Sequence, residues 1–366
     1  MNIYVLDPED ISILAVVNSY SARNWNKVWS ESGSFTLWVP ITEENKEFLV
    51  RENLIWPDDQ DCVGVIERVH NYTSEEGTPL MEVSGRFSEQ AYLFRRIIWG
   101  NARISDYPAN IIKFLIQNQA VDCLDTDRQL GPGINPIVSI LPGTPLQEEI
   151  DYCNSYGNLW EEVKGLSIEY NLHVEFRYAQ DLLNAVIFSS VDRSDTVILS
   201  TDLGFLTNSD YLCDSTDYCN TALIAGEGEG AEREKAYILS QETQRNRREL
   251  YVDARDLQKN SSSSEDPMTE EEYISVLVQR GQKKLLEYPL CESYECSLQV
   301  TGEEGYVFGE DYNLGDTVTL IDNILGVQVQ AQVKEHQIDE DKDGRTDTLV
   351  FGISIPTITS IVKRRS

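Results

Sequence analysis

The sequence predicts an α+β fold that is rich in β-strands, with β-structure at both ends of the chain and a mixed middle. Near the N-terminus, short runs of β-branched and aromatic residues alternate with turn residues, which indicates an antiparallel sheet or small barrel. Helical apolar spacing follows, and strand-like alternation returns near the C-terminus. We therefore expect an N-terminal β-barrel-like domain at 1–105, an α+β domain at 106–240, and a helix with a C-terminal β-barrel-like domain at 241–366.

The N-terminal strands are predicted from three runs. Phe35–Val39 is a strand that Pro40 ends, and Cys62–Val69 and Leu80–Ser84 are two more. In the middle, Asp106-Tyr107-Pro108 begins a helix whose apolar stripe is Ile111, Ile112, Leu115 and Ile116. A second helix is expected over 158–170, although Gly165 weakens it, and short strands are expected near 172–178, 185–191 and 196–200.

The C-terminal part begins with a polar linker at 259–266 and the clearest helix of the chain. Asp266 and Pro267 suit its start, and Thr269 with Glu272 has the spacing of a capping box. Further on, residues 327–334 alternate Val or Ala with Gln or Lys, which predicts a half-buried strand. Its partner is expected at 349–355, across a turn at 339–347.

The composition is strongly acidic, with 62 Asp and Glu against 30 Lys and Arg, a net charge of −32 and a pI near 4.3. Such a surface repels nucleic acid, so no specific nucleic-acid binding is expected. The acidic surface either provides general solubility or forms a wall past which DNA slides without adhering. No run approaches the ~18 apolar residues of a membrane span, and the N-terminus does not resemble a signal peptide, so assembly in a cytoplasm is expected.

Residues that could support catalysis are few, and we predict no enzymatic activity. The three histidines are His70, His173 and His336, and none belongs to a zinc-protease motif. His70 and His336 lie near predicted strand ends, where a surface histidine is ordinary. No G-x-S-x-G motif is present. Because 62 carboxylates give many chance pairs, a glycosidase pair stays open as an alternative.

One acidic run is a candidate metal site, and no other cofactor is predicted. Asp339, Asp341, Asp343 and Asp347 have the spacing of the first part of an EF-hand loop, which indicates calcium. Position twelve of that loop is Val350 instead of a bidentate glutamate, and the flanks read as strands. An acidic hairpin turn that binds no metal is therefore the main alternative.

Four segments, in order, resemble a family of siphophage tail proteins. They are Val83–Ile98 (VSGRFSEQAYLFRRII), Gly226–Arg233 (GEGEGAER), Arg247–Asp256 (RRELYVDARD) and Asp311–Val318 (DYNLGDTV). The opening of the chain, with Trp25 and Gly33–Leu37, also fits. The resemblance covers nearly the whole chain. Proteins of this family are similar to the N-terminal hub portion of tail-associated lysins.

The resemblance implies tail-tube-like β-barrel domains at both ends and a homotrimeric hub at the virion tail tip. Such a ring would join the tail tube or distal tail protein to the tip and line or close the DNA channel. The implied partners are the chain itself, the distal tail or tail tube protein, the tape measure protein, and tip or receptor-binding proteins. Two alternatives stay open: a tail-tip hydrolase of peptidoglycan or glycan, and a receptor- or carbohydrate-binding module.

Overall fold

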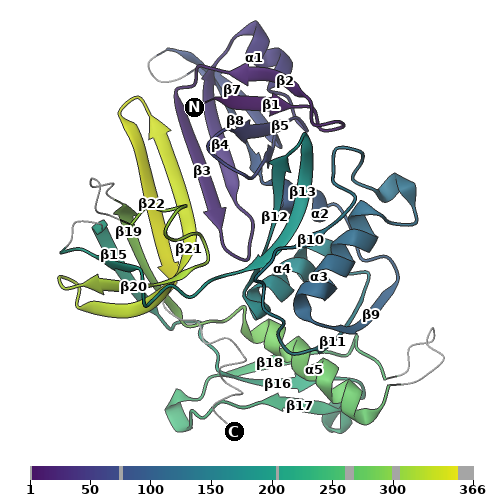
Figure 1. Ribbon diagram of the computed structural model, residues 1–366. Helices are drawn as coiled ribbons and strands as arrows, with labels where there is room; N and C mark the ends of the chain where they lie inside the picture. Colours follow the sequence, from purple (N-terminus) through teal and green to yellow (C-terminus); the bar gives the residue numbers. More distant parts are fainter. Residues whose placement is uncertain (1, 74–76, 203–205, 260–267, 299–305, 353–366) are drawn as a thin grey trace.

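The computed structural model describes residues 2–73, 77–202, 206–259, 268–298 and 306–352. Its largest sheet places strands from both ends of the chain side by side (Figure 1). Its strand order is β15 (Leu206–Asp214), β19 (Cys291–Leu298), β22 (Gly344–Gly352), β21 (Val327–Asp341), β3 (Ala22–Val28), β4 (Ser34–Pro40), β8 (Pro79–Arg86) and β7 (Arg68–Thr73). β20 (Thr317–Asp322) pairs with β21 and, in parallel, with β14 (Ile198–Ser200).

The two ends of the chain meet at the antiparallel pair β3–β21. In this register Trp25 lies opposite Ile338, and both side chains are buried. Trp25 also packs on Phe35 and Phe87, at ring-centroid distances of 5.5 and 4.9 Å. Buried apolar pairs across neighbouring strands are the main stabilising unit of a sheet. One continuous core therefore includes residues from both termini.

A second N-terminal sheet has the order β2 (Ile13–Val17), β1 (Ile3–Leu6), β5 (Leu54–Pro57) and β6 (Gly64–Val65), with α1 (Glu43–Phe48) before β5. The strand predicted over Cys62–Val69 is in fact two strands, β6 and β7, in different sheets. The chain passes between the sheets at Ile66 and Glu67. Gly85 permits this crossing, because a Cβ there would lie 1.8 Å from the Val65 carbonyl oxygen.

The middle of the chain follows the predicted pattern closely. α3 (Pro108–Ile116) begins with Pro108 in its first turn, and the four residues of its predicted stripe are fully buried. α4 (Leu159–Tyr170) is capped by Asn158, whose side chain accepts from Glu161 N. It is followed by the hairpin of β12 (Leu172–Ala179) and β13 (Leu182–Ser189). The remaining elements are α2 (Ser88–Leu93), β9 (Asn101–Asp106), β10 (Ser139–Ile140) and β11 (Ile150–Ser155).

The predicted capping box is confirmed at α5 (Glu270–Leu285). Thr269 and Glu272 exchange both hydrogen bonds, while Asp266, Pro267 and most of the predicted linker lie outside the described residues. One face of α5 covers a three-stranded sheet. Gly281 allows close contact, since a Cβ there would lie 2.5 Å from the Ile224 side chain. The sheet has the order β17 (Lys235–Ile238), β16 (Thr221–Ala225) and β18 (Glu249–Asp253).

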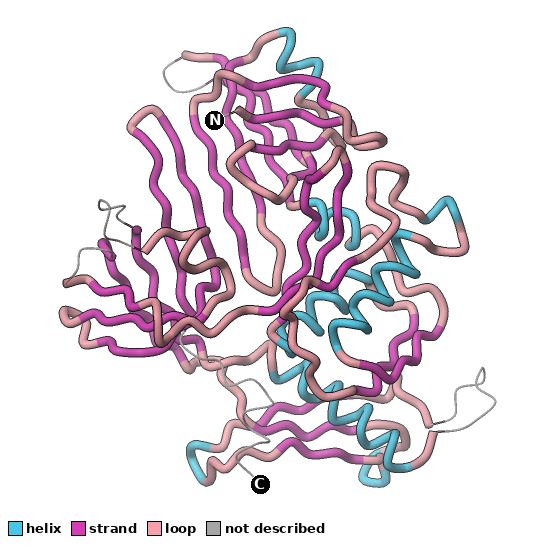
Figure 2. The backbone as a smooth tube through the Cα atoms, viewed as in Figure 1, coloured by secondary structure: helices cyan, strands magenta, loops and turns pink. Residues whose placement is uncertain are grey.

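The predicted α+β, β-rich class is confirmed, whereas the closed barrels are not present in the described part of the chain. There every sheet is open, and the strands expected in two terminal barrels share one long sheet. Alternation reports which face of a strand is buried, but not which strand lies beside it. Figure 2 shows α2–α4 gathered beside the β12–β13 hairpin, with α5 below them. No helix among the described residues has the length and apolar character to cross a membrane.

Candidate functional site at the junction of the two chain ends

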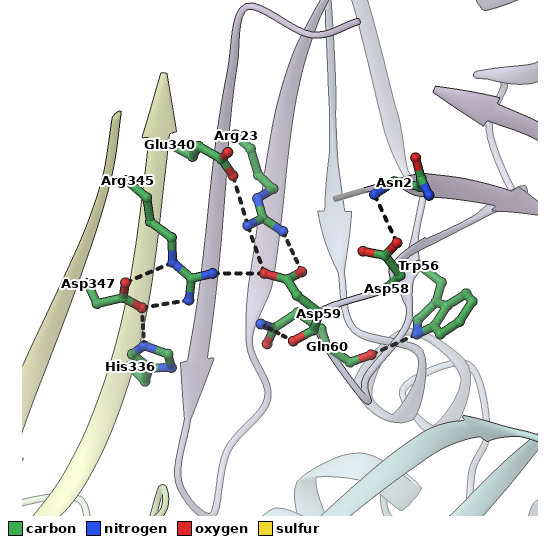
Figure 3. Close-up of polar contacts among 10 residues, drawn as sticks. All are labelled: Asn2, Arg23, Trp56, Asp58, Asp59, Gln60, His336, Glu340, Arg345 and Asp347. Carbon is green, nitrogen blue, oxygen red and sulfur yellow. Dashed lines mark hydrogen bonds and ion pairs between the residues drawn. The ribbon is translucent and has the colours of Figure 1, made fainter. Parts of the chain in front are cut away.

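A buried arginine joins three separate parts of the chain. Arg23 on β3 is 2% exposed, and its guanidinium donates to both carboxylate oxygens of Asp59, at 2.9 and 3.1 Å (Figure 3). Its Nη2 also lies 3.0 Å from Glu340 Oε2 on β21. Asp59 belongs to the loop after β5. Because a guanidinium presents several donors in one plane, a single side chain holds β3, this loop and β21 together.

The same network continues onto β22. Arg345 Nη1 donates to Asp59 Oδ2 at 2.9 Å, and its Nε donates to Asp347 Oδ2 at 2.8 Å. Asp347 Oδ1 lies 2.7 Å from His336 Nε2 (Figure 3). Acidic and basic groups therefore alternate from Glu340 through Arg23, Asp59, Arg345 and Asp347 to His336. We call these six residues the junction network.

Burial and pairing set the charges of the junction network. Burial raises the pKa of Asp347, but the hydrogen bonds from His336 and Arg345 outweigh it and hold that pKa well below its usual range. Burial lowers the pKa of His336, and Asp347 only partly opposes that shift. Near neutral pH we therefore infer a neutral His336 that donates from Nε2 to an ionised Asp347. This imidazole is 4% exposed and lies 4.2 Å from the Phe308 ring, so it has little access to a substrate.

The structure separates the four predicted calcium ligands. Asp339 and Asp341 lie on β21, Asp343 lies in the turn, and Asp347 lies on β22. Asp339 is opposite Thr346 while Asp347 is opposite Ile338, so these two carboxylates lie on opposite faces of the hairpin. Asp339 accepts from Asn24 and Gln337, and Asp347 belongs to the junction network. Only Asp341 and Asp343 are joined, through a 2.8 Å bond from Asp343 N.

The described residues contain no group of three or more side chains placed to hold a metal ion. The acidic run forms the tip of a β-hairpin. An acidic hairpin turn is the shape that the sequence offered as the alternative to a calcium loop. Calcium binding at Asp339, Asp341, Asp343 and Asp347 stays a prediction, and their geometry does not supply one common coordination shell.

The expectation of a surface position for His336 is wrong, because a β-bulge changes the phase of β21 and buries its side chain. From Val327 to Val333 the odd-numbered residues face the core. A register shift between Val333 and Glu335 reverses this pattern, so that His336 and Ile338 face inward instead. Arg23 and Asp59 were also missed, since they meet only through pairing of distant strands.

A further buried acid lies in α2. Glu89 is 1% exposed, and its Oε1 accepts from Ser32 Oγ at 2.8 Å. Its Oε2 has no hydrogen-bond partner within the part of the chain that the structure describes. Burial raises the pKa of Glu89 to about 7. The carboxyl group therefore changes charge near neutral pH inside the protein.

Residues of the four segments that resemble siphophage tail proteins make contacts between elements of the fold. Arg86 donates to Glu67 at 2.8 and 2.6 Å across the crossing from β6 to β7. Asp316 accepts from Val191 N at 2.9 Å and from Arg193 Nε at 2.8 Å. Gly315 has φ +89°, and a Cβ there would lie 2.2 Å from the Trp29 ring. Each of these positions therefore holds two elements of the fold together.

Solved phage tail proteins share this fold. The 43 kDa tail protein of prophage MuSo2 from Shewanella oneidensis is 14% identical, with a TM-score of 0.59, and the match covers 96% of this chain and 98% of that one. The tail protein from Neisseria meningitidis MC58 is 14% identical, with a TM-score of 0.59 and coverages of 98% and 99%. Prophage tail protein gp18 from Listeria monocytogenes EGD-e is 13% identical, with a TM-score of 0.54 and coverages of 100% and 98%.

No curated protein matches the chain in sequence at a significant level. A family profile does match, over residues 2–353, and its description is Siphovirus ReqiPepy6 Gp37-like protein. The match includes the four segments at 83–98, 226–233, 247–256 and 311–318, together with β3 and the hairpin of β21 and β22. The chain therefore belongs to the siphovirus tail-protein family of Siphovirus ReqiPepy6 Gp37-like proteins.

Proposed function

We propose that this tail protein is a structural hub subunit of the tail tip or baseplate. In this proposal identical copies form a ring, a homotrimer by resemblance, that joins the tail tube or distal tail ring to the tip. The ring lines or closes the DNA channel and performs no bond cleavage. Its other neighbours are the tape measure protein and the tip or receptor-binding proteins.

The observation that carries the proposal is the shared sheet at the junction of the two chain ends. β3 and β21 pair through seven residues each, and the junction network binds both strands to β22 and to the loop after β5. A subunit that transmits force between neighbours requires its ends to move as one body. Cross-strand pairing with buried, hydrogen-bonded charges supplies that rigidity.

The acidic composition supports a position along the DNA path. The chain carries 62 acidic and 30 basic residues, and like charges repel the phosphate backbone. An acidic wall would let DNA pass without adhering. A map of the assembled ring would test this, since the proposal requires carboxylates on the bore and not only on the outer surface.

Oligomeric state in the presence of neighbours is the sharpest test. Native mass spectrometry of the purified chain, alone and co-expressed with its distal tail protein, should give a trimer or a larger complex with a fixed number of copies. Electron cryo-microscopy of that complex should place the chain around the axis of the tail. A chain that stays monomeric, and does not join the distal tail protein, would refute the hub.

The two alternatives give different outcomes. Release of muropeptides or glycan fragments by the purified chain would establish a hydrolase, and the hub proposal predicts none. Saturable binding of the chain to host cells without any tail neighbour would favour a receptor-binding module. For calcium-assisted binding, calorimetry with calcium should show heat that Asp341→Ala removes.

A further inference from the structure

A cavity of about 330 Å³ lies beside the His336 end of the junction network, where β3, the β12–β13 hairpin and the segment 308–316 meet. Its charged lining residues come from these three parts, from the loop after β5 and from the segment after β13. Its volume falls within the range of small-molecule sites. These residues are Lys27, Asp61, Glu175, Arg177, Arg193 and Asp316. We call this cavity the cationic pocket, because its basic side chains keep unused hydrogen-bond donors.

Two of its three acids are already satisfied by the protein. Glu175 accepts from Arg177 Nε at 2.7 Å through one oxygen, and its other oxygen lies 3.4 Å from His173 Nε2. Asp316 accepts from Val191 N, Asn313 N and Arg193 Nε, at 2.9, 3.0 and 2.8 Å. Both acids are buried. Little acceptor capacity is therefore left on them for a ligand.

The basic groups, in contrast, keep donors for a ligand. Arg177 and Arg193 each use only Nε for these carboxylates, and within the described residues their Nη groups make no hydrogen bond. Lys27 Nζ likewise makes no hydrogen bond or ion pair in the described part of the chain. Burial lowers the pKa of Lys27, but Cys62, Glu175 and Asp61, in that order, raise it, and the pKa of Lys27 lies above its usual value overall.

Apart from the polar residues Ser189 and Asn313, the rest of the lining is apolar. Phe188, Val191, Phe308 and Leu314 border the cavity, and the Arg177 guanidinium lies 4.7 Å from the centre of the Phe188 ring. Three cations face three acids in total, so the lining is formally balanced. A singly charged acceptor disturbs this balance less than a dianion such as phosphate would.

We propose that the cationic pocket binds a carboxylate group carried on a small apolar body. Lys27 and the Nη groups of Arg177 and Arg193 would donate to the carboxylate, and the Phe188 and Phe308 side chains would contact the body. The carboxylate has two sources of the same chemistry, a small metabolite or an acidic side chain of a second copy of this chain.

Isothermal titration calorimetry of the full chain with benzoate tests the inference, and benzamide is the uncharged probe of matched shape. Benzoate should bind and benzamide should bind at least about tenfold more weakly, a difference of roughly 1.4 kcal/mol. Lys27→Gln should weaken benzoate binding by a similar factor, because it removes an ammonium that has no ion pair to lose. Lys46→Gln, on the exposed helix α1, is the matched control and should leave binding unchanged.

Arg193→Gln is a second variant, and Asp316 retains two backbone donors there. Equal binding of benzoate and benzamide, or unaltered benzoate binding in both folded variants, would overturn the proposal. Sedimentation at low and high protein concentration separates the two sources. If benzoate dissociates an oligomer that Lys27→Gln also disrupts, the acid comes from a second copy. If benzoate binds with no change in oligomeric state, the ligand is a small molecule.

Discussion

Arg23 on β3 and Glu340 on β21 lie directly opposite each other, and their side chains form an ion pair of 3.0 Å. Because Arg23 also holds Asp59, its loss would leave Glu340 without a cation and Asp59 with Arg345 alone. The arginine is almost fully buried, while each acid keeps about a quarter of its side-chain surface in solvent. Arg23 is therefore the one buried cation that contacts both β21 and the loop after β5 within the described residues.

Replacing Arg23 should destabilise the protein strongly. We expect Arg23→Met to lower the free energy of unfolding by about 3 kcal/mol, the lower end of the range for breaking a buried ion pair. Urea unfolding followed by tryptophan fluorescence measures this, since Trp25 lies on the same strand. Arg68→Met removes an exposed partner of Glu82 and should cost less than about 1 kcal/mol. Equal losses in the two variants would contradict the role given to Arg23.

His336 should make stability depend on pH in the mildly acidic range. Its folded pKa is lowered from 6.5, so the unfolded chain binds the proton more readily. The contribution of His336 to stability is therefore present above pH 6.5 and is lost as the pH falls toward the folded pKa. His336→Gln should flatten the plot of unfolding free energy against pH below 6.5. His70→Gln, on the exposed edge strand β7, should keep the wild-type slope.

Glu89 should make the stability of the protein depend on pH in the direction opposite to that of His336. Its folded pKa of about 7 is raised from 4.5, so the folded protein holds a proton that the unfolded chain has lost. Stability from this group is complete below pH 4.5 and is lost as the pH rises through about 7. We expect Glu89→Gln to stabilise the protein above that pH, by up to about 3 kcal/mol.

Thermal unfolding across neutral pH measures this effect. Glu47→Gln, an exposed carboxyl on α1, should show no such gain. If Glu89→Gln were less stable than wild type at every pH, the buried carboxyl would be a required acceptor and the raised pKa would not govern stability.

Gly315 should tolerate no side chain. Its φ of +89° disfavours other residues, and a Cβ would overlap the Trp29 ring. Gly315→Ala should therefore cost about 3 kcal/mol, from left-handed strain and overpacking together. Gly326→Ala is the matched control, because its φ is +70° but its Cβ would meet open space. That variant should cost only the backbone strain of about 1 kcal/mol, and equal losses in denaturant unfolding would show that Trp29 moves aside freely.

Local patterns were read correctly from the sequence where a short segment contains all the information. The stripe of α3, the capping box at Thr269 and Glu272, and the strand around Phe35 are examples. The pairing of β3 with β21 could not be predicted in this way, because alternation is the same whichever strand lies beside it. The bulge after Val333, which turns His336 inward, also leaves no signal in residue types.

The separation of the four candidate calcium ligands has a related reason. Spacing along the chain places four aspartates near one another, but an extended hairpin sends alternate side chains to opposite faces. Asp347 consequently joins Arg345 and His336, two residues that no motif connects with it. Two features of the sequence favoured a hairpin tip over an EF-hand loop: the strand-like flanks and Val350 at position twelve.

The pairing of β3 with β21 has a consequence for how the protein is made. Asn24 and Asp339, bonded at 2.7 Å, are 315 residues apart in the chain. During synthesis β3 leaves the ribosome long before β21 is made. Until then, the amide and carbonyl groups on one side of β3 have no partner strand. Exposed strand edges of this kind invite aggregation, and distant pairings form slowly. Truncated or stalled nascent chains of this tail protein should thus be strong clients of host chaperones.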